Sequence, residues 1–275
     1  MRSIRAIAAA LLLVGLCGCL AGGFEHVGAL FELGSSARAL GMGGAFTALV
    51  DDESAVMHNP AALGWLDGLG ISSLYVSQFG GISYGSLGAA LPCVGLNVLF
   101  LDSGFIPTQG GAIRYSSQGL VASTGIAMGP IGIGARWRLL RVSSPTRGRG
   151  WAFDPALLLV TDVVRAGMIL EGALSSPMDY DAGPEEAWPL ALRLGVALTL
   201  SPSLDVSWSA AFEASGLFTA SSRLTLGLEA WIGEMGARVG FDGEALTYGL
   251  SVRFAGLQFD WAYAARTDLG ASHRV

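Results

Sequence analysis

Large apolar residues alternate with small or polar residues along much of the chain, most regularly between Leu190 and Leu200. Every even position there is Leu or Val, and the odd positions are Ala, Arg193, Gly195 or Thr199. Because successive side chains of a strand point to opposite faces, each such segment has one apolar face. Hydrophobic residues make up 52% of the sequence and charged residues only 14%, against about 25% charged in soluble domains. We therefore predict an all-β fold, a transmembrane antiparallel β-barrel with its apolar face outside.

About fourteen strands are expected, an even number as in most bacterial single-chain barrels. The predicted strands are 69–78, 81–91, 93–102, 113–128, 131–142, 151–160, 163–174, 189–200, 203–213, 222–233, 236–242, 245–254, 256–265 and 268–275. In the clearest of them Leu192 should face lipid and Arg193 the lumen. A register slip by one residue would move arginine into hydrocarbon at about 2–4 kcal/mol near the midplane, so the pattern fixes the register.

The connections between the strands give an independent signal. Long connections are expected at 103–112, 143–150, 175–188 and 214–221, and short ones at 129–130, 161–162, 201–202 and 234–235. They alternate in the middle of the chain, as expected if long loops lie on one membrane side and tight turns on the other.

Two uncharged stretches, 69–101 and 115–135, are long enough to be considered as membrane helices. Glycines, hydroxyl residues and a proline (Pro92 and Pro130, respectively) interrupt both at intervals too short for a helical span. Each divides more naturally into two strands around its proline. We therefore prefer strands in both stretches.

The beginning of the chain is typical of a secretory signal peptide. A basic start and an apolar run over residues 7–16 lead to the small-residue sequence Cys19-Leu20-Ala21, which suits cleavage before Gly22. We expect residues 1–21 to be removed, and lipidation of Cys19 is the alternative. After cleavage only Cys93 remains, so the mature chain can form no internal disulfide.

Residues 24–66 differ in character from the rest, and three blocks stand out in them. These are Ala37–Phe46 (ARALGMGGAF), Asp51–Ala55 (DDESA) and Asn59–Leu63 (NPAAL). In these blocks the chain resembles the PorV/PorQ-type outer-membrane barrels, a largely uncharacterised family distantly related to FadL-type transporters of hydrophobic compounds. A weaker match lies at 257–264 and 268–274, so the resemblance covers essentially the mature chain.

The resemblance implies a fourteen-stranded barrel in the bacterial outer membrane, surrounded by outer-membrane lipid. It also implies that residues 22–66 form a plug with one or two small helices inside the lumen of a barrel built from residues 67–275. The family's last strand usually continues past a His-Arg pair to an aromatic residue, whereas this sequence ends at Val275. We therefore expect a short last strand.

The conspicuous residues of the plug segment have structural explanations. Gly41-Met42-Gly43-Gly44 has neither the preceding strand nor the Lys-Ser/Thr pair of a phosphate loop, so we expect close packing of a turn against the barrel wall. Asp51, Asp52 and Glu53 lack the spacing of a calcium loop and are typical of the first turn of a helix. Asn59-Pro60 favours a turn. The structural plug motif that we assign comprises Arg38, Gly41, Gly43, Gly44, Asp51, Asp52, Asn59 and Pro60.

The predicted lumen face is the most polar surface and carries charges of both signs. Its charged residues are Arg136, Arg138, Arg165, Glu171, Arg193, Asp205, Glu213, Arg223, Glu229, Arg238, Arg253 and Asp260. Such a lining suits either a polar conduit or a layer of ion pairs that grips the plug. We prefer the second interpretation. The loop with Arg147 and Arg149 could touch anionic lipid headgroups, although a solvated loop is the simpler interpretation.

Catalytic and cofactor chemistry finds no support in the sequence. The three histidines lack metal-ligand spacing, and no G-x-S-x-G stretch is present. The net charge of −6 provides no basic field for nucleic acid. We expect no enzyme activity, no cofactor, no metal site and no nucleic-acid partner.

Two functions remain, with an outer-membrane enzyme as a distant third. Transport of a small hydrophobic compound across the outer membrane, which the FadL-type relation implies, predicts an apolar passage through plug and wall. An interaction with secretion-system proteins, as in PorV-like barrels that assist protein secretion or surface anchoring, predicts a filled lumen and apolar outer loops. Pro177, Met178, Tyr180 and Trp188 in the loop 175–188 hint at the latter. We favour transport.

Overall fold

The computed structural model describes residues 27–78, 82–108, 111–144, 146–203, 205–265 and 272–274. The expected signal peptide (1–21), its cleavage site, Cys19 and His26 lie outside the described residues. Among the residues that are described, no helix is both long and apolar enough to cross a bilayer.

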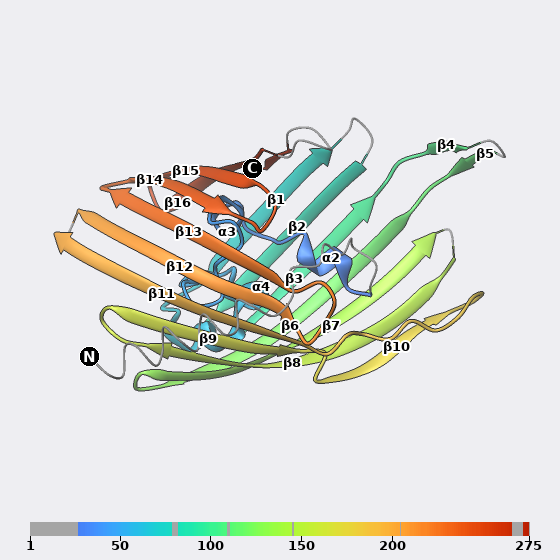
Figure 1. Cartoon of the computed structure of the whole chain (residues 1–275), viewed down its shortest axis with the longest axis horizontal. Coiled ribbons are helices and arrows are strands. Elements are labelled where there is room, and N and C mark those ends of the chain that lie inside the picture. The colour runs from blue at the N-terminus through green and yellow to red at the C-terminus, as the bar shows by residue number, and fades with distance from the viewer. Residues whose placement is uncertain are drawn as a thin grey trace.

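Antiparallel strands build almost the whole molecule (Figure 1). The first eight strands are β1 (Gly70–Gln78), β2 (Ile82–Leu91), β3 (Val94–Asp102), β4 (Ile106–Thr108), β5 (Gly111–Ile113), β6 (Ser116–Met128), β7 (Ile131–Ser144) and β8 (Gly148–Val160). The others are β9 (Val164–Glu171), β10 (Leu174–Tyr180), β11 (Ala191–Ser203), β12 (Val206–Leu217), β13 (Arg223–Ile232), β14 (Met235–Phe241), β15 (Leu246–Phe254), β16 (Leu257–Ala264) and β17 (Ser272–Arg274).

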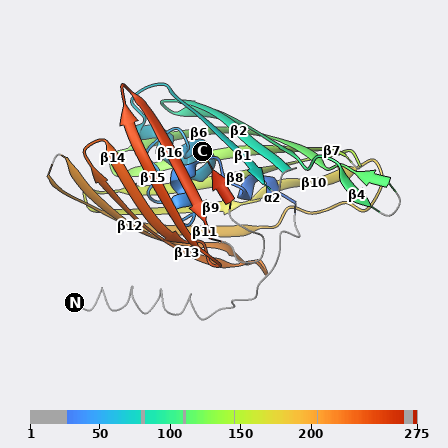
Figure 2. The same ribbon diagram turned by 90° about the horizontal axis from the view of Figure 1, so that it is seen from above.

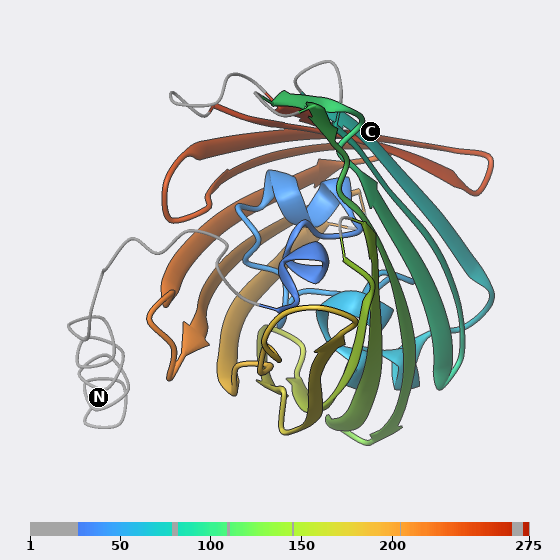
Figure 3. The same cartoon turned by 90° about the vertical axis from the view of Figure 1, so that its right-hand side faces the viewer.

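One curved sheet contains fourteen of these strands as successive antiparallel neighbours, in the order β1-β2-β3-β6-β7-β8-β9-β11-β12-β13-β14-β15-β16-β17. Each of the fourteen predicted segments overlaps one of them, so the predicted strand number and antiparallel order are confirmed. The sheet curls around the N-terminal helices (Figure 3), and its ends, β1 and β17, come within 8 Å between Cα atoms. Among the described residues the last strand, β17, is three residues long and pairs with β16.

Two long connections contain strands that the sequence did not predict. The connection predicted at 103–112 holds a separate hairpin of β4 and β5, in which Ile106 pairs with Ile113; it projects from one end of the sheet in Figure 1. The connection predicted at 175–188 begins with β10, which pairs with the first half of β8 while β9 pairs with its second half. Gly172, at a positive φ of 67°, marks the break between β9 and β10.

The two faces of the sheet follow the alternation in the sequence. On β11 the side chains of Val196, Leu198 and Leu200 are exposed on the outer face, whereas Gly195 and Ala197 are buried. Leu198 is 48% exposed and its neighbour Ala197 0%. Arg193 points inward with Gly195 and Ala197, and Leu192 lies on the opposite, outer face. The predicted register is thus the one that the structure has.

Residues 27–66, the described part of the expected plug segment, lie inside the sheet (Figures 2 and 3). They contain α2 (Ala29–Glu32), α3 (Ala37–Gly41), α4 (Ala55–His58) and the 3₁₀ helix η1 (Pro60–Trp65). The Ser36 side chain accepts a hydrogen bond from Ala39 N at the start of α3, and Asn59 does the same for Ala61 N at the start of η1. These side chains satisfy backbone donors that a helix start leaves unpaired.

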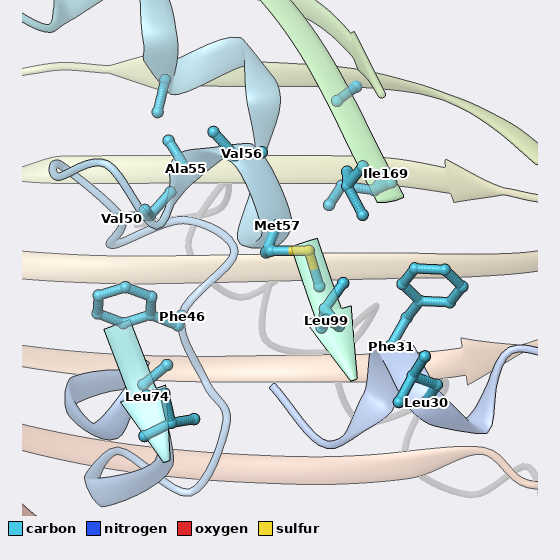
Figure 4. Packing of buried hydrophobic residues seen from close by; sticks show 14 of the residues in the cluster. Leu30, Phe31, Phe46, Val50, Ala55, Val56, Met57, Leu74, Leu99 and Ile169 are labelled. Atoms are coloured by element: carbon cyan, nitrogen blue, oxygen red, sulfur yellow. The ribbon is translucent and has the colours of Figure 1, made fainter. Parts of the chain in front are cut away.

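The buried core lies between this segment and the inner face of the sheet. Figure 4 shows Leu30, Phe31 and Met57 of the plug beside Leu99 and Ile169 of the wall. The outer face keeps its apolar side chains exposed, which is the reverse of a soluble β-sandwich, whose apolar faces meet in a core.

Candidate functional site

Inward-facing glycines let the backbone of the plug approach the wall closely. A Cβ atom on Gly134 of β7 would lie 2.3 Å from the backbone nitrogen of Ala61, and one on Gly240 of β14 would lie 2.3 Å from that of Gly43. Gly43 itself has a positive φ of 68°. The glycines at inward positions of the wall therefore match the plug, and the close packing expected for the turn at Gly41–Gly44 is what the structure has.

We expect Gly134→Val to displace η1 from the wall and to lower the free energy of unfolding by about 1–3 kcal/mol, as overpacking typically does. Gly68→Val is the matched control, because nothing lies within 4 Å of a Cβ at Gly68. Urea unfolding of the vesicle-inserted protein measures both. Equal free energies for the two variants would show that plug and wall are not in contact.

Arg38 of the plug motif is the centre of the first ion-pair cluster. Its Nε and Nη2 atoms donate to the two carboxylate oxygens of Glu229 on β13, at 2.9 and 2.8 Å. Its Nη1 donates to Asp51 at 2.5 Å and to Asp52 at 3.0 Å. The side chains of Arg38 and Glu229 are 5% and 2% exposed. One buried guanidinium thus joins two parts of the plug to a strand nearly two hundred residues away.

Asp52 also stabilises the turn that leads into α4. Its carboxylate accepts a hydrogen bond from Ser54 N at 3.0 Å, just before α4, and its backbone carbonyl accepts one from Ala55 N. The acidic residues thus precede α4, whose first turn contains none of them, so the expectation that they form the first turn of a helix is wrong. Asp51 binds Arg38 instead. Asp51 also lies 3.9 Å from Arg165 of β9.

A second cluster holds the middle of the plug through Glu213 of β12. One carboxylate oxygen of Glu213 accepts from the backbone nitrogens of Phe46 and Thr47, at 3.0 and 2.8 Å. The other accepts from Arg193 of β11 at 3.1 Å, and Arg193 also reaches Glu171 of β9 at 3.2 Å. Arg193 lies on the inner face of the sheet, and its two acidic partners come from the neighbouring strands.

A third cluster surrounds Asp154 of β8, which is completely buried. Its carboxylate accepts from Arg136 at 2.6 Å, from Arg138 at 2.9 Å and from Gly172 N at 2.6 Å. Arg136 continues to Glu171 at 2.6 Å and donates to the backbone carbonyl of Met57 in the plug. This cluster ties the break between β9 and β10 to the plug.

Hydrogen bonds to backbone carbonyls add to the contacts between the wall and the plug. Arg165 donates to the carbonyl of Leu49 at 2.7 Å. The Asn59 amide donates to Thr47 O within the plug at 2.9 Å and to Leu157 O on β8 at 3.1 Å. Pro60 follows as the first residue of η1. Asn59 thus caps η1, links two parts of the plug and binds the wall.

Three residues of the predicted lumen lining lie at its ends, outside the three ion-pair clusters. Asp205 was wrongly placed in the lumen: it is exposed in the turn before β12, because β12 begins only at Val206. Arg253 is exposed near the short-turn end, with its guanidinium 3.7 Å from the ring centroid of Trp231. Arg223 lies at the start of β13, 3.9 Å from Glu244. These positions are at the ends of the lumen, where strand periodicity no longer decides the environment.

Asp260 and Arg238 belong to the first cluster. Arg238 donates to Glu229 at 2.5 Å and lies 3.5 Å from Asp260. Ser251, which the sequence did not single out, hydrogen bonds to both Arg238 and Asp260.

The end of the lumen on the side of the long connections has a different, apolar lining. Its inward wall residues are Leu74, Val76, Leu99, Val121, Leu140 and Val142, all of them buried. Phe31 of α2 and Trp188 from the connection after β10 fill this space, with ring centroids 6.1 Å apart. Arg138 lies beneath both rings, 5.4 and 5.0 Å from their centroids. This combination of a packed apolar layer above an ion-paired layer is the candidate functional site.

His58 in α4 is the histidine of the plug that the structure describes. His58 packs edge-on against Phe46 at 5.3 Å between centroids. Burial lowers the pKa of His58 to about 3, with Arg193 and Arg136 acting in the same direction, so its imidazole is neutral. Within the described ranges, no group of three or more His, Cys, Asp or Glu residues is placed to hold a metal ion.

Comparisons with known proteins bear on the fold. No family model matches the chain, and no curated protein matches it in sequence. Two solved structures are similar: the "CymD monoaromatic hydrocarbon channel" and the Pseudomonas putida toluene transporter TodX. Each has 14% sequence identity and a TM-score of 0.56, over 88% of this chain and 95% of the other. The chain thus has the fold of outer-membrane hydrocarbon channels, in agreement with the FadL-type part of the resemblance.

Proposed function

We propose that the protein lies in the bacterial outer membrane and admits a small hydrophobic compound through the apolar end of its lumen. The observation that carries this proposal is the contrast within the lumen. Charged groups that hold the plug are paired with one another, whereas the wall next to Phe31 and Trp188 is mostly apolar, with Arg138 beneath both rings. A mostly apolar lining suits a hydrophobic ligand. The two similar structures, a monoaromatic hydrocarbon channel and a toluene transporter, support the same class of substrate.

Access to this apolar layer would depend on two aromatic side chains that come from separate parts of the chain. Phe31 belongs to a four-residue helix, and Trp188 belongs to the irregular connection between β10 and β11. Neither is held by a strand pairing, although Met178 and Glu186 form an isolated bridge nearby. We infer that these side chains move aside when a ligand enters, while the ion pairs keep the rest of the plug in place.

Uptake of radiolabelled toluene by cells that lack their own channels for it tests the proposal. Expression should raise the initial uptake rate, and Trp188→Ala should raise it further because the substitution removes an obstruction. Trp151→Ala is the matched control, since Trp151 lies on the outer face of β8. Folded protein in the outer membrane that gives no uptake above the empty strain would contradict transport of this class of compound.

The loop residues that hinted at a PorV-like role divide into two pairs. Met178 and Trp188 are buried, at 0% and 6% exposed, whereas Pro177 is exposed and Tyr180 partly exposed. An interaction with secretion-system proteins therefore stays the alternative, with a smaller apolar surface in that loop than the sequence suggests.

A further inference from the structure

The outer face of β6, β7 and β8 carries a groove that the proposed transport route does not use. It has a volume of about 780 Å³, and its lining includes Leu120, Leu139, Arg141, Arg149 and Trp151. A second concavity of about 400 Å³ shares Leu120, Leu139 and Trp151 with the first and continues to Ala122 and Trp137. The two hollows therefore form one depression that runs along the strands.

The strand register orders the side chains of this depression in three rows. The first row joins Gln118 to Arg141 and Arg141 to Arg149. The second row joins Leu120 to Leu139 and Leu139 to Trp151. Directly opposite residues of this kind have Cβ atoms about 5 Å apart.

The third row holds Ala122, Trp137 and Phe153. Trp137 lies 5.4 Å from Trp151 and 5.8 Å from Phe153 between ring centroids. Neighbouring rows are two residues apart along a strand, so the first and third rows lie roughly 14 Å apart. Over this distance the lining of the depression changes from hydrogen-bonding to apolar side chains. Such a belt of aromatic residues is typical of the boundary between hydrocarbon and headgroups.

The two arginines of the first row are unusual neighbours. Arg141 and Arg149 are directly opposite each other on the outer face, and both are exposed. In the part of the chain that the structure describes, neither makes an ion pair within 4 Å. Like charges in this position repel each other. An anion between the two guanidinium groups would replace this repulsion by two charge-assisted contacts.

We propose that the depression binds a phosphorylated lipid of the outer leaflet, lipid A, with one phosphate between Arg141 and Arg149. An acyl chain then lies over Leu139 and Trp151 toward Trp137. The long connections of such barrels face the cell exterior, and the arginine row lies at that end of β7 and β8, at the level of the outer-leaflet headgroups. This inference rests on the proposed outer-membrane location, but it concerns the outer wall and is independent of what the lumen carries.

The far side of the groove carries two acidic residues, Asp179 of β10 and Glu185. Asp179 pairs with Arg149 in the strand register. These carboxylates would attract an amine beside the phosphate, as in phosphatidylethanolamine. Their effect on binding therefore distinguishes phosphatidylethanolamine from lipid A. A lipid A phosphate gains nothing from them, and their neutralisation should leave its affinity unchanged or raise it.

Native mass spectrometry of the full chain in detergent, titrated with diphosphoryl lipid A, tests the proposal. Wild-type protein should retain one lipid, and the double variant Arg141→Ala/Arg149→Ala should bind it at least about tenfold more weakly. Arg223→Ala, on the opposite part of the wall, should bind like wild type. Unchanged affinity of the folded double variant would overturn the proposal.

Three further measurements keep the test independent of how the double variant folds. Dephosphorylated lipid A should bind wild-type protein at least about tenfold more weakly, and equal binding would overturn the phosphate contact. Millimolar inorganic phosphate should not displace the lipid, and displacement would reduce the groove to a simple anion site. In a parallel titration, phosphatidylethanolamine that binds more tightly than lipid A and loses affinity in Asp179→Asn/Glu185→Gln would assign the groove to an amine-bearing phospholipid instead. A protein that inserts into vesicles but fails these measurements refutes the lipid site alone.

Discussion

Arg38→Ala is expected to lower the free energy of unfolding by about 3–5 kcal/mol, the usual cost of breaking a buried ion pair by removing one partner. The substitution leaves Glu229, which is 2% exposed, with Arg238 as its remaining partner, and it separates Asp51 and Asp52 from the wall. The plug should therefore become accessible to protease at a denaturant concentration that leaves the strands intact. Urea titration of vesicle-inserted protein, with limited proteolysis at each point, measures both effects.

Arg223→Ala provides the control for this prediction. Its partner Glu244 is 57% exposed and 3.9 Å away, and exposed pairs of this kind contribute at most about 1 kcal/mol. If Arg38→Ala proved as mild as Arg223→Ala, the ion pairs would not be what holds the plug.

Leu198→Arg on β11 is expected to destabilise the barrel by about 2–4 kcal/mol, because it places a charge on the lipid face near the membrane midplane. Leu198 is 48% exposed on the outer face and lies in the middle of the strand. Leu69→Arg is the matched control, since Leu69 is 64% exposed but precedes β1 at the end of the sheet. Near the interface an arginine costs only about 0–1 kcal/mol. Unfolding in vesicles of fixed thickness measures the difference, and equal costs would contradict the assigned depth of β11.

The structure also changes the stability cost that we expect for replacing Arg193 on the same strand. From the sequence, replacing it by Leu should matter little unless a buried pair is broken. Arg193 bridges Glu171 and Glu213, so Arg193→Leu would leave both carboxylates without this partner. Its cost should therefore approach that of Arg38→Ala rather than that of a surface substitution.

The strands could be predicted because their signal is local. A period of two is visible within single segments, in β7 from Ile131 to Leu139 and in β11 from Ala191 to Leu200. The hairpin β4–β5 and strand β10 could not be predicted in this way. β4 and β5 have three residues each, too few to show a period. β10 forms because one edge of β8 is free to pair with it, and a local sequence pattern does not indicate such a free edge.

The sequence predicted which charged residues face the candidate site, but not which of them form ion pairs with one another. The alternation places Arg136, Arg138 and Arg193 on the inner face, yet no local pattern indicates that Arg38 should meet Glu229. Asp154 could have been found, because it alternates with the inward residues Ala152 and Ala156 on β8. Trp188 could not, since its burial depends on how an irregular connection folds back over α2.

The central claim is that a curved sheet presents its apolar face to lipid and its ion-paired face to the plug. Single nitroxide labels at each position from 194 to 200, on a background in which Cys93 is replaced by Ser, test it most directly in vesicles. The structure predicts that collisions with oxygen, which concentrates in lipid, are frequent at positions 194, 196, 198 and 200 and rare at 195, 197 and 199. Accessibility without a period of two, or frequent collisions with a water-soluble reagent at positions 196 and 198, would contradict the account.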